Sequence, residues 1–194
     1  MFNIPILFII FNRPDKTLKV LEEIRQVKPQ KLYISADGPR CNNSKDLNKC
    51  EVTRKLVLDN IDWECEFYTK FNDENLGCRE AVNSAINWFF LHEEMGIILE
   101  DDCLPSNSFF YFCSDLLERY KNDTRIMMIS GFNHLGKWPN NGQSYFFSQL
   151  GAIWGWASWR RAWELNDTKM KGWPNIKEQR LLFKVFKTYD QAAY

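Results

Sequence analysis

The sequence predicts an α/β domain built around a mostly parallel sheet, and two observations support that prediction. Short apolar runs, typical of strands buried on both faces, alternate with longer segments in which apolar residues recur at helical spacing. The 194 residues, of which 45% are hydrophobic, suffice for one domain with a substantial core. This alternation favours right-handed connections between parallel strands, whose ligands bind at the carboxyl ends of those strands.

The first half of the chain shows four strands separated by three helices. A strand is expected over residues 4–11, and a helix over 15–27 follows it, ending before Pro29. The other expected strands cover residues 32–36, 64–69 and 97–99. The other expected helices cover residues 44–59 and the apolar stripe of Val82, Ala85, Ile86 and Phe89.

The second half of the chain is less regular. A helix is expected over residues 107–120 and an apolar strand over 126–130. Residues 151–159, rich in Gly and Trp, match no regular core element, and a final helical stretch is expected over 177–188.

Charge and cysteine content exclude several classes of function. Lys+Arg and Asp+Glu are both 25, so no net field exists to hold nucleic acid or an anionic membrane. The six cysteines include no C-x-x-C pair and the two histidines complete no zinc spacing, so we expect free thiols. No apolar run approaches the ~20 residues of a transmembrane segment. Residues 1–11 look like a strand and not a signal peptide, which predicts a cytoplasmic protein, free or peripheral at the inner face of the membrane.

The loop after the first strand lacks the phosphate-binding patterns of two large enzyme classes. It contains Phe11-Asn12-Arg13-Pro14-Asp15 where a dinucleotide-binding protein carries G-x-G-x-x-G. The lysine-bearing loop of P-loop enzymes is missing as well. A nicotinamide-dependent dehydrogenase and a P-loop ATPase are therefore both disfavoured.

Three consecutive acidic residues, Glu100, Asp101 and Asp102, follow the fourth expected strand. At the carboxyl end of a buried strand they would face the ligand cleft, where their hard oxygen atoms suit Mn²⁺ or Mg²⁺ shared with phosphate oxygens. The alternative is that these carboxylates only solvate a turn or cap the next helix.

Arg13, Asp37 and Arg79 are expected at the same edge of the sheet, just beyond strands or at the start of a helix. A guanidinium suits phosphate, and a carboxylate suits a base or ribose hydroxyl. Each of them is also compatible with an ordinary surface charge or a helix cap.

The segment Trp154-Gly155-Trp156, with Trp159 after it, could stack on sugar rings through the broad apolar faces of the indoles. An aromatic core under long loops, or an interface patch, is the alternative interpretation. Cys103 and His134 are interpreted as structural or surface positions.

Several motifs together resemble a known family. They occupy residues 11–14, 35–38, 98–105 with the helix start at 109–112, 151–163 and 172–174. With these motifs, nearly the whole chain resembles GT-A nucleotide-sugar transferases, specifically bacterial family 2-like polysaccharide glycosyltransferases related to the N-acetylglucosaminyltransferase that initiates complex N-glycans. The block at 98–105, with its Pro and following Phe-Phe helix, is the most specific of them.

The resemblance implies a fold and an activity. The fold would be a Rossmann-like three-layer sandwich forming a single domain, with a nucleotide-sugar-binding half at 1–104 and the start of an acceptor-binding half at 105–194. The activity would be inverting transfer of a hexosyl or N-acetylhexosaminyl group from a UDP- or dTDP-sugar to a hydroxyl of a glycan acceptor, lipid-linked acceptors included, in surface polysaccharide synthesis. Nucleic acid is not an expected partner.

The resemblance also implies roles for individual residues. Asp102 would bind the metal, while Asp101 and Glu100 would position ribose, a metal-bound water or the donor sugar. Nucleotide contacts would come from Asn12, Arg13, Asp37 and Arg79. Trp154, Gly155 and Trp156 would line the donor-sugar and acceptor pocket.

One part of the family pattern is missing. The resemblance implies an acidic catalytic base in a Trp-Asp-like motif well after Trp173-Pro174, and no such motif occurs before Tyr194. Glu178 and Asp190 are acidic but their neighbours do not fit, so the base stays unknown and we expect a C-terminally incomplete domain. A non-catalytic nucleotide-sugar or glycan-binding module is the alternative. A nucleotidyltransferase ranks last, since its Gly-rich basic loop after the first strand is absent.

Overall fold

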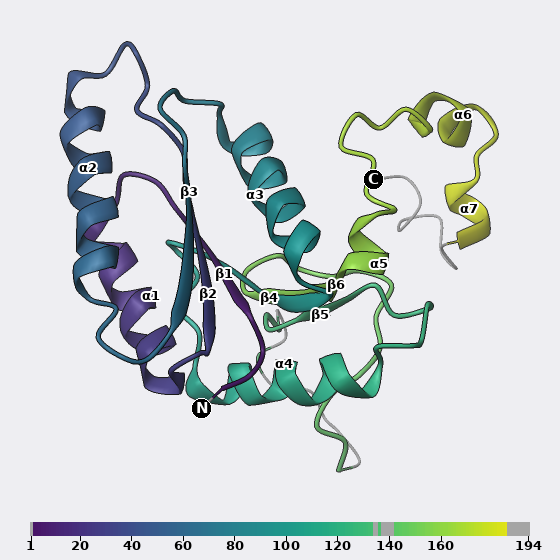
Figure 1. The fold of residues 1–194 in the computed structure, drawn as a ribbon. Helices are drawn as coiled ribbons and strands as arrows, with labels where there is room; N and C mark the ends of the chain where they lie inside the picture. The colour runs from purple at the N-terminus through teal and green to yellow at the C-terminus, as the bar shows by residue number, and fades with distance from the viewer. Residues whose placement is uncertain (1, 134–135, 137–141, 186–194) are drawn as a thin grey trace. The chain divides into compact units, whose positions relative to one another are not determined.

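The computed structural model describes residues 2–133, 136 and 142–185, which fall into two units, Met1–Glu164 and Leu165–Tyr194. A mixed sheet with the strand order β3-β2-β1-β4-β6-β5 forms the centre of the first unit (Figure 1). Its parallel part contains β1 (Ile6–Ile10), β2 (Lys31–Ala36), β3 (Glu66–Phe71) and β4 (Met95–Glu100). Its antiparallel part contains β6 (Trp156–Trp159), next to β4, and β5 (Met128–Ser130), at the edge.

Helices cover both faces of this sheet, because the strands are apolar on both sides. Residues such as Phe8 and Leu99 face a core formed with α1 (Pro14–Val27), α2 (Ser44–Asp59) and α4 (Asn107–Arg119). Residues such as Leu7 and Ile98 face a second core formed with α3 (Cys78–His92) and α5 (Arg160–Trp163). The predicted α/β fold with a mostly parallel sheet between two helical layers is confirmed.

The first helix illustrates how local sequence sets the bounds of the elements. Pro14 begins α1, where its missing N–H costs nothing, and Lys28 ends it in a left-handed conformation with φ 50°. Val20, Leu21 and Ile24 form its buried face against the sheet. The first strand is shorter than predicted, since its pairing with β2 ends at Ile10 and its pairing with β4 ends at Ile9.

One predicted irregular segment contains a strand. Residues 156–159 form β6, which pairs antiparallel with β4 and carries Trp156 and Trp159 on opposite faces. The prediction for residues 151–159 was therefore wrong at its C-terminal end. A four-residue strand buried on both faces has no polar and apolar alternation by which it could be recognised.

The predicted helix over 177–188 is also corrected where the structure describes it. Two short helices occur instead, α6 (Trp173–Glu178) and α7 (Leu182–Val185), with Arg180 between them at a positive φ of 51°. No residue of α6 is buried, so packing gives a longer helix no support. Residues 186–188, Asp190 and His134 lie outside the described residues.

Two further expectations concern the cysteines and membrane insertion. All six cysteines are free thiols, as predicted. Within the described ranges no helix is both long and apolar enough to span a bilayer. The expected halves 1–104 and 105–194 stay a prediction, and the first unit contains strands from both.

Candidate functional site

The strand order reverses its direction between the neighbouring strands β1 and β4. The connection through α1 leads from β1 to β2 on one side, whereas the connection through α3 leads back to β4 on the other side. In open α/β sheets, such a reversal of direction between two neighbouring strands is where ligands bind. The acidic residues that follow β4 and residues 11–13 that follow β1 both lie at this reversal point.

Asp101 joins the ends of these two strands. Its carboxylate is buried, accepting a hydrogen bond from the Phe11 amide at 3.3 Å and one from Arg13 Nη1 at 3.3 Å. The same Nη1 of Arg13 donates to Asp102 Oδ2 at 2.9 Å. The Arg13 and Asp102 side chains are 46% and 42% exposed, so both charged groups are accessible from solvent.

The electrostatics of this cluster follow from burial and crowding. Burial raises the pKa of Asp101 even though the Arg13 cation opposes it. Burial also raises the pKa of Glu100, and the charges of Asp102 and Asp101 add to that effect. The hydrogen bond to Asp102, with the charge of Asp101, raises the pKa of the Arg13 guanidinium, which therefore stays a cation.

The fit of these residues to a metal ion depends on their free oxygen atoms. In the part of the chain that is described, no three His, Cys, Asp or Glu side chains are grouped so that they could hold a metal by themselves. Asp102 engages Arg13 through Oδ2, while its Oδ1 has only the weak Cys103 thiol at 3.8 Å. One or two carboxylates are what Mg²⁺ uses when phosphate oxygens complete its shell. The donor set thus fits a metal shared with a phosphate ligand.

Asp37 lies at the predicted edge, but its carboxylate is buried and engaged within the protein. Its two oxygens accept hydrogen bonds at 2.8–3.2 Å from five donors, namely the amides of Gly38, Leu76 and Gly77 and the side chains of Asn72 and Asn75. The nucleotide contact expected of Asp37 stays a prediction, because the described hydrogen bonds of both oxygens lie within the protein. Asp37 fastens the loop of residues 72–77 to the end of β2.

Two other predicted nucleotide contacts also have partners inside the protein. Asn12 donates from Nδ2 to Asp46 Oδ1 at 2.9 Å, so its side chain points toward the start of α2. Arg79, in the first turn of α3, forms its ion pair with the adjacent Glu80 at 3.1 Å and is 78% exposed. Among the described contacts, neither side chain joins the cluster around Asp101.

The three tryptophans of residues 154–159 have different environments. Trp156 is 8% exposed and packs near Trp163 with ring centroids 6.2 Å apart, and Trp159 is equally buried in the other core. These two residues fit the aromatic-core interpretation, and the predicted sugar contact of Trp156 lacks an exposed ring face. Trp154 is 64% exposed. Its ring lies 5.6 Å from that of Phe132 between centroids, and the next residue, Gly155, has a positive φ of 70°.

An arginine that sequence reasoning missed lies at the same edge. Arg40, in the loop after β2, donates to the buried Asp46 through Nε at 2.5 Å and Nη2 at 3.1 Å. The Arg40 hydrogen bond is the main cause that lowers the pKa of Asp46 to about 2. A basic residue after an Asp-Gly-Pro turn is too common a pattern to have indicated this pair.

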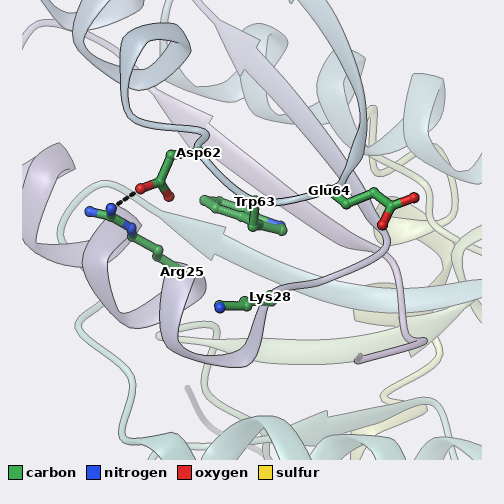
Figure 2. A pocket seen from close by; sticks show the side chains of 5 residues that line it. All are labelled: Arg25, Lys28, Asp62, Trp63 and Glu64. Carbon is green, nitrogen blue, oxygen red and sulfur yellow. Dashed lines mark hydrogen bonds and ion pairs between the residues drawn. The ribbon is translucent and has the colours of Figure 1, made fainter.

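A hollow of about 430 Å³ lies elsewhere, between the end of α1 and the residues that precede β3 (Figure 2). Its lining comprises Arg25, Lys28, Asp62, Trp63 and Glu64, and Arg25 is ion-paired with Asp62 across it. These residues precede β2 and β3, so the hollow opens at the amino edge of the parallel strands. It is separated from the acidic cluster by the length of the sheet.

Comparison with known proteins leaves the family open. No protein-family model matches the chain, and no curated protein matches it. Among solved structures the chain is similar to a cytidylyltransferase from Leptospira borgpetersenii serovar Hardjo-bovis (strain JB197), with 11% sequence identity and a TM-score of 0.47. That similarity covers 92% of this chain and 71% of the other. A likeness this distant decides nothing about function, and the fold assignment rests on the strand order and pairing.

Proposed function

We propose that the chain is a nucleotide-sugar-dependent glycosyltransferase of the GT-A type, or the donor-binding portion of one. The single observation behind this proposal is the cluster at the reversal point, where buried Asp101 links the ends of β1 and β4 beside Arg13 and Asp102, which are accessible from solvent. A cation beside a free carboxylate oxygen matches a diphosphate accompanied by a divalent metal. A UDP- or dTDP-sugar provides that diphosphate.

The residues divide the work of donor binding. Arg13 donates hydrogen bonds to phosphate oxygens and gives up its hydrogen bond to Asp102 for them. Asp101 keeps the Arg13 guanidinium in place. Asp102 would bind Mn²⁺ or Mg²⁺ through its carboxylate oxygens, one of which becomes free when Arg13 turns to the phosphate. The metal, when bound, neutralises the leaving diphosphate. Glu100, whose pKa is raised, and the exposed Trp154 are the residues that would contact the donor sugar.

The general base for the acceptor hydroxyl is not assigned to any residue. Glu178 ends α6 in the second unit and is exposed, and nothing in its surroundings marks it as a base. Donor binding does not require that base, whereas transfer loses about 10²–10⁴-fold in rate without it. Binding is therefore the property that tests this proposal.

The test is calorimetric titration of UDP and dTDP with and without Mn²⁺ or Mg²⁺. Asp102→Asn should abolish the metal-dependent part of the affinity, a loss of about 1–3 kcal/mol or roughly 10–100-fold. Asp115→Asn is the matched control, because Asp115 is also an exposed aspartate paired with an arginine, Arg119, at 2.9 Å. If Asp102→Asn binds UDP with metal as tightly as the unchanged protein, the metal assignment is wrong.

A further inference from the structure

Arg40 forms a fork with Asp46, a two-pronged ion pair in which one edge of the guanidinium, Nε and Nη2, donates to the two carboxylate oxygens. None of the hydrogen bonds described for this side chain involves Nη1. The Arg40 side chain is 54% exposed, whereas that of Asp46 is 2% exposed. A buried anion thus holds a half-exposed arginine whose Nη1 donates none of the hydrogen bonds described.

The fork belongs to the same edge of the sheet as Arg13. The guanidinium carbon of Arg40 lies 5.6 Å from the centre of the Phe11 ring, and Asn12 donates to the same Asp46. Phe11, Asn12 and Arg13 are consecutive, and the loops after β1 and β2 leave these parallel strands at their carboxyl ends. Arg40 therefore lies on one side of residues 11–13, and Asp101 and Asp102 lie on the other.

Arg40 is held more firmly than an arginine in an ordinary surface ion pair. An exposed pair usually contributes little to stability and leaves both side chains mobile. Here the carboxylate is buried, a second donor fixes it, and an aromatic ring lies against the guanidinium. An arginine held in this way is pre-organised, and its free edge suits bidentate recognition of phosphate.

We propose that Arg40 is a second phosphate-contacting residue of the site, and that Asp46 is the positioning residue that aims it. This inference rests on the proposed function for the identity of the ligand, a nucleoside diphosphate with its metal. Arg40 approaches this segment at Phe11, whereas the Arg13 guanidinium lies at Asp101 and Asp102, so the two arginines bind diphosphate oxygens from two sides. The cluster itself is rich in carboxylates, so the anion binds as its metal complex.

The test uses two probes, magnesium pyrophosphate and magnesium UDP, in calorimetric titrations. Arg40→Gln should weaken both by 10-fold or more, and Arg40→Lys, which keeps the charge but loses the fork, should fall between. The matched control is Arg125→Gln. Arg125 forms the same Nε and Nη2 fork with Asp123, at 2.9 and 2.7 Å, and lies in the turn before β5, at the amino edge.

Asp46→Asn tests the positioning role through a double-mutant cycle. Combined with Arg40→Gln it should add little further loss of affinity, although each change lowers the melting temperature separately. Fully additive losses in affinity would remove Asp46 from this role. Thermal melts accompany every variant, and Arg40→Lys decides the matter if Arg40→Gln does not fold.

The possible outcomes separate this inference from the proposed function. If both Arg40 variants bind both probes as the Arg125→Gln protein does, the inference is overturned while metal-dependent UDP binding stands. If pyrophosphate binds in an Arg40-dependent way but UDP and dTDP do not bind, the inference is supported and the proposed function fails. If the unchanged protein binds neither probe, both are overturned.

Discussion

At the scale of single residues, two carboxylates of the site have opposite electrostatic environments. Asp46 has its pKa lowered to about 2 by Arg40 and Asn12, so it stabilises the fold above its unfolded pKa of about 3.9, and that stabilisation is lost as the pH falls through 2. Glu100 has a raised pKa through burial and the neighbouring charges of Asp102 and Asp101. Ionised Glu100 therefore costs stability, and this cost grows as the pH rises above the unfolded pKa of about 4.3 and is complete above the folded pKa.

Glu100→Gln should raise the melting temperature at pH 7, because it removes a partly buried charge that is repelled by two others. The difference from the unchanged protein should shrink as the pH falls and vanish below the unfolded pKa of about 4.3. Thermal melts between pH 3.5 and 8 measure it. Glu51→Gln, at an exposed position of α2, should show no such pH-dependent gain. A Glu100→Gln protein that melts lower at pH 7 would contradict the repulsion.

At the scale of elements, the loop of residues 72–77 is held to the end of β2 by Asp37 and Gly38. Asp37 accepts hydrogen bonds from three backbone amides and from two asparagine side chains. A Cβ at Gly38 would collide with the backbone of Glu74, so the loop lies directly on this glycine. Arg54 of α2 also donates hydrogen bonds to the backbone carbonyl oxygens of Asp37 and Asn72. This loop leads into α3 and fixes where that helix begins.

Asp37→Ala should destabilise the protein by about 3 kcal/mol, because it leaves buried amides without an acceptor. That loss corresponds to roughly 6–12 °C in melting temperature for a chain of this size. Asp73→Ala removes an exposed aspartate from the same loop and should change stability little. Gly38→Ala should destabilise as well, through the collision with Glu74. If Asp37→Ala binds UDP more weakly but keeps its full thermal stability, the result would support the nucleotide contact predicted from the sequence and contradict the structural role.

The sequence predicted the elements of the parallel part well because their patterns are strong. Helix α2 has the predicted bounds, and β2 and α1 differ from them by one residue at one end. Predictions failed where packing decides the conformation, as in β6, whose two tryptophans face different cores. They also failed in the stretch around Arg180, where no buried face supports a continuous helix.

The site was predictable to the extent that strand ends define it. The acidic residues after β4 and Arg13 after β1 meet because β1 and β4 are neighbours with their carboxyl ends together. A carboxylate at that edge can be available to a ligand or engaged in hydrogen bonds within the protein. Contacts between segments that are distant in the sequence decide which of the two applies. Asp37 and Asp46 are both buried for that reason, and their partners are separated from Asp37 by up to 40 residues in sequence and from Asp46 by up to 34.

At the scale of the whole molecule, both hydrophobic cores lie within the first unit. Among the residues that the structure describes, those of the two cores and those packed against them precede Leu165. The described helix α6 of the second unit buries no side chain. The stability of the sheet should therefore be independent of residues 165–194.

Residues 1–164 expressed alone should fold and unfold cooperatively, with a melting temperature within a few degrees of the 194-residue chain. The reason for this expectation is that the described residues of both cores precede Leu165. Near-ultraviolet circular dichroism and thermal melts of the two proteins provide the measurement. A shortened protein that exposes apolar surface to a dye, or lacks a sharp transition, would show that the second unit supports the sheet.

The position of β6 between β4 and β5 has a consequence for synthesis on the ribosome. Chains fold from the N-terminus as they emerge, and the parallel strands β1 to β4 are complete by residue 100. Until residues 156–159 follow, β4 has β1 on one side and an open row of backbone amides and carbonyls on the other. The strand that ends in the acidic residues is thus enclosed late, and a nascent chain stalled before Trp156 exposes this edge to pairing with other chains.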